Sequence, residues 1–300
     1  MYKRFVWLAV VCSTLCIPEL ASAEIRLKDA MNREVVLAQP AQRIVSLAPH
    51  ITEVVFAAGA GEQLVGAVSY SDYPDAAKQI ARVGSYNSVS YESIVALNPD
   101  LVIAWQSGNG EEVVQRLVSL GLNLYVTQPD KLEDVALSLR HIGILSGNVK
   151  QGDIAADKFL ARLTELKNTY SQQSTVDVYY QIWNEPMMTM NGKHLISDVI
   201  RLCGGHNVFA DALPLVPRIS VESVVRANPE VIVASGMGQS RPEWLDDWRD
   251  WTAIDAVHNE QLYFIPPELL QRHTPRIIQG AEQMCAFLEQ ARDQRALANH

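Results

Sequence analysis

Beyond its first 23 residues the sequence lacks any long hydrophobic run: no later stretch reaches the ~18 consecutive apolar residues that a membrane-spanning helix needs. The first 23 residues have a basic start at Lys3 and Arg4, a short apolar core and the small residues Ala21 to Ala23. This is the pattern of a cleaved secretory signal. The sequence therefore predicts an exported, soluble protein, not embedded in a membrane, whose mature chain begins at Glu24.

Cysteine is scarce, with four residues in 300, and two of them, Cys12 and Cys16, fall inside the expected signal. Cys203 and Cys285 remain as an even pair in an oxidising compartment, which predicts a disulfide. Such a bridge closes a loop of roughly 80 residues and contributes about 3–5 kcal/mol in the chain-entropy view.

Basic residues are outnumbered. Removal of the signal leaves 23 Lys and Arg against 33 Asp and Glu, a net charge of −10. This balance argues against nucleic acid and anionic membrane surfaces as partners, and it is compatible with docking onto a basic surface.

Familiar catalytic motifs are also missing: there is no Gly-x-Ser-x-Gly, His-Glu-x-x-His, P-loop or Cys-x-x-Cys. Gly59 and Gly61 are a poor match to a dinucleotide fingerprint, because they follow an expected helix instead of opening one. The scattered histidines supply no cluster of metal ligands. We therefore expect a protein that is not an enzyme and holds no resident metal or cofactor.

What the sequence does contain is a repeat. Ser90–Ala104 recurs as Ser220–Ala234, with seven identical positions and five aliphatic or Asp/Glu exchanges. Each copy reads as a serine cap, a short helix ended by Asn-Pro, and a β-branched run typical of a strand buried on both faces. A duplicated unit of this length predicts two related lobes with a cleft between them.

Strand-like and helix-like segments alternate in both halves, which predicts parallel sheets covered by helices. The alternation breaks at 148–169, where apolar residues recur at helical spacing over about six turns. The expected fold class is α/β, two Rossmann-like lobes with parallel sheets joined by one long rigid backbone helix. We expect a signal peptide at 1–23, an N-terminal lobe at 24–147, the connecting helix at 148–173 and a C-terminal lobe at 174–300.

Three further motifs complete the pattern: Ser-Tyr-Ser-Asp-Tyr-Pro at 69–74, Leu-Cys-Gly-Gly at 202–205, and Arg272 followed by Thr-Pro-Arg-Ile-Ile at 274–278. Together these features resemble the periplasmic substrate-binding proteins of ABC importers for vitamin B12, siderophores or haem. The Tyr-Ser-Asp-Tyr-Pro run and the cysteine pair are specific signals for the cobalamin-binding members. The resemblance implies a monomeric periplasmic protein that delivers cobalamin to an ABC permease dimer with its ATPase subunits, with haem or a ferric siderophore as the alternative ligand.

The resemblance also implies which residues contact the ligand. Tyr70, Tyr86 and Trp105 are expected against the corrin ring, because a flat macrocycle buries well against rigid aromatic faces. The position of Trp105 corresponds to Ser235 in the second repeat, so the first lobe is expected to supply most of the aromatic surface. If the ligand is haem, Tyr70, Tyr86 or His50 is the candidate axial ligand.

Polar and loop residues complete the expected ligand site. Glu268 and Arg272 are expected at the amide-bearing rim of the ligand, where polar tips give orientation. Pro49 and His50 lie in the first strand-to-helix loop, which faces the cleft in this architecture. Trp183 stands at the end of a second-lobe strand and either lines the cleft or fills the core of the lobe.

Glu92 and Glu222 occupy equivalent positions in the two repeats, each just inside a helix start. The helix dipole favours a first-turn acid by under about 1 kcal/mol, which is a sufficient structural reason for either one alone. As a pair they match the twofold symmetry of a permease dimer. The resemblance implies that they dock onto permease arginines, an interaction that sets orientation and association rate.

Overall fold

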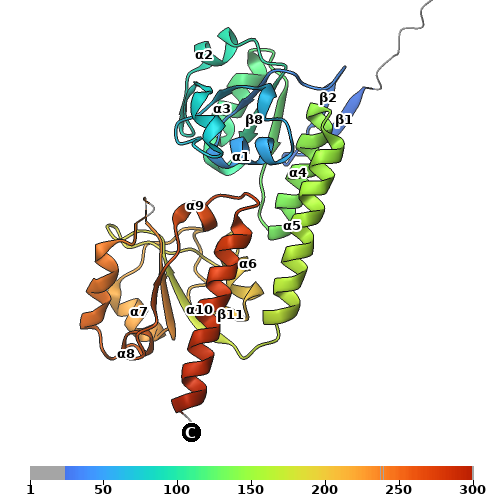
Figure 1. Cartoon of the computed structure of the whole chain (residues 1–300). Coiled ribbons are helices and arrows are strands. Elements are labelled where there is room, and N and C mark those ends of the chain that lie inside the picture. Colours follow the sequence, from blue (N-terminus) through green and yellow to red (C-terminus); the bar gives the residue numbers. More distant parts are fainter. Residues whose placement is uncertain (1–23, 237, 239, 299–300) are drawn as a thin grey trace, which may run out of the picture.

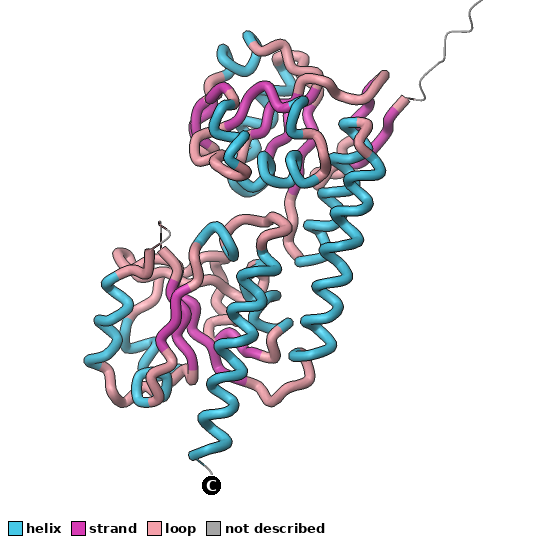
Figure 2. Tube along the Cα trace, in the orientation of Figure 1, coloured by secondary structure: helices cyan, strands magenta, loops and turns pink. Residues whose placement is uncertain are grey.

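The structure is a computed structural model that describes residues 24–236, 238 and 240–298, so the expected signal peptide lies outside the described residues. Two α/β lobes lie one beyond the other beside a long helix, α5 (Val149–Tyr170), as Figures 1 and 2 show. The first lobe runs from blue to green in Figure 1, and the second from yellow to red. The predicted fold class is confirmed.

The first lobe is built on a five-stranded parallel sheet. Alternate residues of its central strands belong to different cores: Ile103 packs with α1 and α4, whereas Val102 packs with α2 and α3. Successive side chains of a strand point to opposite faces, so a continuous apolar run suits a sheet covered on both sides. In spatial order the strands are β5 (Ala81–Arg82), β4 (Leu64–Ala67), β3 (Ile44–Ser46), β8 (Leu101–Trp105) and β9 (Leu124–Thr127).

The second lobe has a four-stranded parallel sheet that is likewise covered by helices on both faces. Tyr180 and Val233 face the core that contains α6 and α10, and Tyr179 and Ile232 face α7 and α8. The strands in spatial order are β11 (Gly205–Asn207), β10 (Val176–Gln181), β12 (Val231–Ala234) and β13 (Leu262–Phe264).

The helices alternate with the strands along the chain. In the first lobe they are α1 (Pro49–Ala57), α2 (Tyr91–Ala96), α3 (Gln106–Ser119), α4 (Leu132–Ser146) and the 3-10 helices η1 (Gly61–Gln63) and η2 (Asp75–Gln79). In the second they are α6 (Leu195–Leu202), α7 (Val221–Ala227), η3 (Glu243–Asp250), α8 (Asp255–His258), α9 (Pro267–Leu270) and α10 (Ile277–Ala298). The small antiparallel pairs are β1 (Ile25–Lys28) with β2 (Glu34–Leu37), and β6 (Gly84–Ser85) with β7 (Ser88–Val89).

The two copies of the repeat fold as expected. Ser90 and Ser220 cap α2 and α7, their hydroxyls accepting from the backbone N–H of the residue three positions later at 3.2 and 3.4 Å. Asn98 and Asn228, which precede the prolines, both adopt a φ of +44°. The helices then lead into β8 and β12, so the repeat builds one equivalent unit in each lobe.

Helix α5 has 22 residues, a length of about 33 Å, and packs against α4. Gly143 and Gly152 mark a close approach of these helices, because a Cβ on Gly152 would meet the Gly143 Cα at 3.0 Å. One apolar core continues from the first sheet past α5 to the second sheet. The lobes therefore share buried surface as well as a covalent connection.

The predicted disulfide between Cys203 and Cys285 is confirmed, and it ties the end of α6 to α10 within the second lobe. In the part of the chain that the structure describes, none of the helices combines the length and the apolar character required to cross a bilayer.

Candidate ligand site between the lobes

The segments that follow the carboxyl ends of the strands meet between the two lobes. Helix α1 follows β3, Trp105 ends β8, and His273 lies in the segment after β13. The His50 and Trp105 rings lie 5.0 Å apart, and the ring of His273 from the other lobe lies 5.3 and 5.8 Å from them. Carboxyl-end loops of open α/β sheets are where ligand sites form. We call this region the inter-lobe face.

Three histidines lie close together at the inter-lobe face. The ring of His194, at the start of α6, is 6.3 Å from that of His273. Burial lowers the pKa of His194 and His273 to about 4 and that of His50 well below its usual value, so all three are neutral at pH 7. Within the described ranges, no group of three or more His, Cys, Asp and Glu side chains is arranged to hold a metal ion.

Two of the predicted aromatic residues are brought together, since the rings of Tyr86 and Trp105 lie 6.3 Å apart on the first lobe. Asn109 supports both: its amide nitrogen donates to the Tyr86 carbonyl at 2.6 Å, and its amide oxygen accepts from the Trp105 backbone N–H at 2.6 Å. Tyr70 lies elsewhere on the same lobe, and this residue is 76% exposed. Asn109 thus fixes the backbone from which the Tyr86 and Trp105 rings project.

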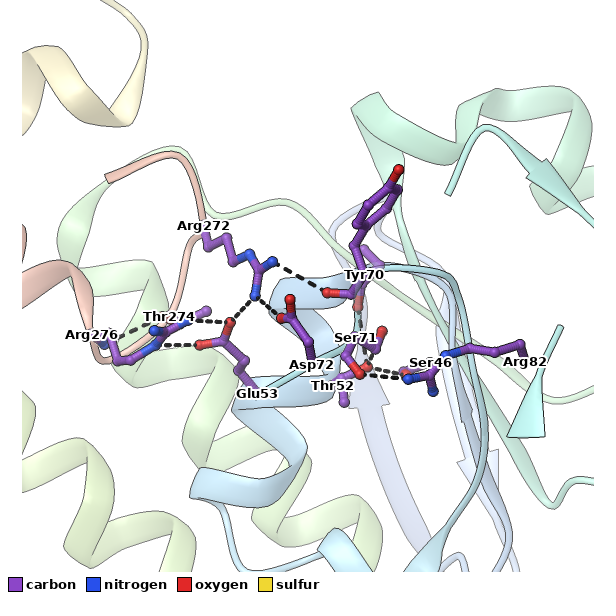
Figure 3. A network of polar contacts seen from close by, with 11 residues as sticks. Ser46, Thr52, Glu53, Tyr70, Ser71, Asp72, Arg82, Arg272, Thr274 and Arg276 are labelled. Carbon is purple, nitrogen blue, oxygen red and sulfur yellow. Dashed lines mark hydrogen bonds and ion pairs between the residues drawn. The ribbon is translucent and has the colours of Figure 1, made fainter. Parts of the chain in front are cut away.

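Arg272 is held by acids of the first lobe (Figure 3). Its Nη1 donates to Glu53 Oε1 at 2.7 Å and to Asp72 Oδ1 at 2.8 Å, and its Nη2 donates to the Tyr70 carbonyl at 3.2 Å. Glu268 lies half-buried on α9, and the described residues show no ion pair between it and Arg272. The role of both residues in ligand contact remains a prediction.

Sequence reasoning missed three residues that meet at this face: Glu53, His273 and Arg276. Arg276 Nε and Nη2 donate to the two carboxylate oxygens of Glu53 at 2.9 and 2.7 Å. The signal that could have found the arginine was its motif, Thr-Pro-Arg at 274–276. Pro49 and His50 were expected in a loop, but they are the first two residues of α1, because Pro is well tolerated at a helix start. Glu53 follows them on α1 without a distinguishing sequence pattern.

The second-lobe loops carry apolar side chains of their own. Trp183 is half-buried, belongs to neither core of its lobe, and donates its indole N–H to the Glu185 carbonyl at 2.8 Å. Its neighbour Met188 forms an isolated bridge to Arg218, so the segments after β10 and β11 support each other. Leu213, also in the segment after β11, is 97% exposed and had no sequence signal.

A groove of about 630 Å³ lies between α5, the start of α10 and the end of α1, and Arg276 of the inter-lobe face lines one side of it. Phe159 and Ile278 supply apolar walls, and Arg162 and Glu282 pair across it at 2.7 Å. None of the ligand-contacting residues that the sequence predicts lines this groove.

The two acids of the repeats lie on different lobes, Glu92 in the first turn of α2 and Glu222 in the first turn of α7, and both are exposed. Hydrogen bonds from the Ser220 hydroxyl and from a backbone N–H lower the pKa of the Glu222 carboxyl. Each lobe therefore offers one solvated carboxylate at the start of an equivalent helix.

Two α/β lobes joined by a long helix, with the carboxyl-end loops of both sheets meeting between them, define a two-lobed solute-binding protein. The family model described as periplasmic binding protein matches residues 44–269. The chain belongs to this family, which confirms the expectation of a binding protein instead of an enzyme.

Relatives and solved structures agree with this assignment. The vitamin B12-binding protein of Vibrio cholerae serotype O1 is 37% identical over 256 residues, which is 85% of this chain and 92% of the relative. The crystal structure of the periplasmic vitamin B12 binding protein BtuF of Vibrio cholerae matches with a TM-score of 0.79 and 36% identity, covering 84% of this chain and 98% of that one. The periplasmic haem-binding protein RhuT from Roseiflexus shares the fold, with a TM-score of 0.74 and 23% identity over 83% of this chain and 98% of its own.

Proposed function

We propose that this protein is the periplasmic component of an ABC importer and that it binds cobalamin between its two lobes. The observation that carries the proposal is the 37% identity to a vitamin B12-binding protein across 85% of the chain. The similarity to the structure of a haem-binding protein is confined to the fold, at 23% identity.

The chemistry of the inter-lobe face supports a flat ligand with an uncharged polar rim. Tyr86 and Trp105 offer aromatic faces on one lobe, and Trp183 and Leu213 offer apolar surface on the other. Aromatic side chains bury large areas against a macrocycle at little entropic cost. The corrin ring with its amide side chains fits this combination of apolar faces and polar tips.

The charge balance supports the same choice of ligand. Arg272 and Arg276 are the basic residues of the cross-lobe network, and the acids Glu53 and Asp72 already neutralise them. The neighbouring histidines are neutral because burial lowers their pKa values. An anionic siderophore or the propionates of haem would need cations that are free to pair. An amide rim needs only hydrogen-bond donors and acceptors.

Calorimetric titration of the mature protein with cyanocobalamin, haemin and a ferric siderophore tests the proposal. We expect one cyanocobalamin bound per monomer, with a change in the corrin absorption spectrum, and weaker or no binding of the other two. Absence of both heat and spectral change with every corrinoid tested rejects the proposal, and tight binding of haemin alone replaces it with the haem alternative.

For delivery, we propose that Glu92 and Glu222 dock onto the permease, one carboxylate per lobe. Both acids are exposed and begin equivalent helices, which places like charges in matching surroundings on the two lobes. Electrostatic pairs of this kind orient a complex and accelerate its formation.

The docking proposal predicts that E92A/E222A abolishes cobalamin uptake while the affinity for cyanocobalamin stays unchanged. The matched control is E62A/E243A, which also removes one exposed acid from each lobe and is expected to retain uptake. Weakened ligand binding in the first double variant, or equal loss of uptake in the control, contradicts docking through these two residues.

A further inference from the structure

We propose that Glu53, Arg272 and Arg276 form an inter-lobe clasp that fixes the spacing of the lobes and holds the segment carrying Tyr70. Glu53 and Arg276 are then positioning residues for ligand binding: they act on the ligand through the geometry of the two lobes. The fixed spacing of the lobes follows from the contacts between them, and its consequence for cobalamin binding rests on the proposed function.

The clasp joins one carboxylate of the first lobe to two guanidinium groups of the second. Arg276 makes a bidentate pair with Glu53, with N–O distances of 2.9 and 2.7 Å, and Arg272 adds a third charge-assisted hydrogen bond at 2.7 Å. All three side chains are largely buried: Glu53 is 2% exposed, Arg276 16% and Arg272 20%. Bidentate Arg–carboxylate pairs are both strong and directional, so they fix relative orientation as well as distance.

The same two arginines hold the Tyr-Ser-Asp-Tyr segment of the first lobe. Arg272 donates to the Asp72 carboxylate and to the Tyr70 carbonyl (Figure 3), and the Arg276 guanidinium sits 3.9 Å over the centre of the Tyr73 ring. This is a cation–π contact that adds to the ion pairs. The clasp therefore grips both α1 and the segment after β4.

Tyr70 needs such support because its φ is +63°, a left-handed conformation that is uncommon for a residue with a side chain. From the first-lobe side, the Arg82 guanidinium donates to the Ser71 carbonyl at 2.9 Å, and the Thr52 hydroxyl donates to the Ser71 hydroxyl at 3.0 Å. From the second-lobe side, Arg272 binds the Tyr70 carbonyl. Contacts on both sides thus determine the backbone from which the exposed Tyr70 ring projects, away from the network in Figure 3.

The groove beside α5 shows why a clasp is needed. Arg276 lines one side of this groove of about 630 Å³, and Phe159 of α5 lines another. The lobes are therefore not packed solidly between the clasp and the connecting helix. With the clasp removed, the segments around Glu53 and Arg276 lose their cross-lobe ion pairs, and the lobes gain freedom to pivot about α5.

The clasp depends on the balance of its charges. Glu53 and Asp72 balance Arg272 and Arg276, so the network is neutral overall. Removing the charge of Glu53 leaves Asp72 as the one carboxylate of the network, so the partly buried Arg276 guanidinium loses its acidic partner. Breaking one partner of a buried pair is far more disruptive than the net value of the intact pair, because the remaining charges lose their compensation.

The test compares E53Q and R276K with D75N in the mature protein. Arg276→Lys retains the positive charge but cannot form the bidentate pair with Glu53. It therefore tests the clasp even if E53Q folds poorly. Asp75→Asn is the matched control, because it removes an exposed ion pair with Lys78 on the same lobe. Spin labels at E112C and R226C, exposed sites on α3 and α7, report the distance between the lobes by double electron–electron resonance.

We expect ligand-free E53Q and R276K to show a broader inter-lobe distance distribution than the wild type, and D75N to show none of this broadening. Cyanocobalamin should narrow the distribution again and bind about tenfold or more weakly to both variants. An unchanged distance distribution in the folded variants overturns the clasp, whatever their affinity. If the wild type binds no corrinoid, the proposed function fails, and the ligand-free distances still decide the clasp.

Discussion

The two lobes use the same helix–strand unit and end it differently. Ser90 and Ser220 cap equivalent helices, and Asn98 and Asn228 share the same left-handed φ of +44°. At the end of the following strand, however, the first lobe has Trp105. The second has Ser235, which is buried and accepts a hydrogen bond from Gln271 at 2.9 Å.

The shared caps and strand cores are features that the fold requires, whereas the strand ends are free to differ between the lobes. Caps and strand cores are alike because the backbone of each unit needs the same hydrogen bonds and the same apolar faces. The carboxyl ends of the strands diverge, which fits the proposal that the first lobe supplies most of the aromatic surface for the ligand. The first lobe carries the neighbouring rings of Tyr86 and Trp105, whereas the second lobe carries Arg272, Arg276 and the disulfide.

We expect the largest effect on the junction of the lobes from a fall in pH, because three buried histidines lie there. Burial depresses the folded-state pKa values of His194 and His273 to about 4 and holds that of His50 well below its usual value. Below about pH 6.5 the unfolded chain binds protons that the native state does not, so stability is full above that pH and is lost as the pH falls toward 4. Each histidine contributes a slope of up to ~1.4 kcal/mol per pH unit in this window.

Urea unfolding between pH 4.5 and 7 measures this slope. We expect the free energy of unfolding to fall steeply below pH 6.5 and His273→Gln, which keeps a neutral polar side chain, to show a shallower fall. The groups that face these imidazoles include Arg272, whose charge opposes protonation of His50. Equal slopes in the variant and the wild type contradict a buried neutral His273.

Removing the disulfide tests the asymmetry between the lobes in stability. C203A/C285A is expected to lose about 2–5 kcal/mol, because the bridge restricts the unfolded chain. The loss should be confined to the second lobe, since the bridge ties α6 to α10. In native-state hydrogen exchange, the variant should exchange faster than the wild type in β10 and β12, with little change in β3 and β8. Equal acceleration in both sheets contradicts a loss of stability confined to the second lobe.

How much of this could be predicted from the sequence depends on the range of the interaction. The repeat, the long helix and the cysteine pair follow local rules of capping, periodicity and composition, and the structure has all three. The bonds from Arg272 and Arg276 to Glu53 join residues 219 and 223 positions apart. Such pairs depend on how two lobes face each other, and no local pattern encodes that.

Trp105 tests the asymmetry of the ligand site. Trp105→Ala should weaken cyanocobalamin binding by about 1.4–2.8 kcal/mol, roughly tenfold to a hundredfold, because a stacked aromatic face is lost. The matched control is Trp251→Ala, an exposed tryptophan outside the inter-lobe residues, which is expected to leave the affinity unchanged. Calorimetry measures both, and an equal effect of the two substitutions contradicts a ligand contact by Trp105.

The smallest expected effect concerns the serine caps, which the two repeats share. Ser90→Ala and Ser220→Ala each remove a cap hydrogen bond, of 3.2 and 3.4 Å, and each should cost about 1 kcal/mol of stability. If the units are equivalent as backbone structures, the two losses agree within about 0.5 kcal/mol, within the spread measured for such caps. Equilibrium unfolding in urea measures them. Ser220→Ala should also raise the pKa of Glu222, because the Ser220 hydroxyl is the leading cause of its lowered value. A large difference in stability between the two variants would mean that the repeats have diverged in their fold as well as at their strand ends.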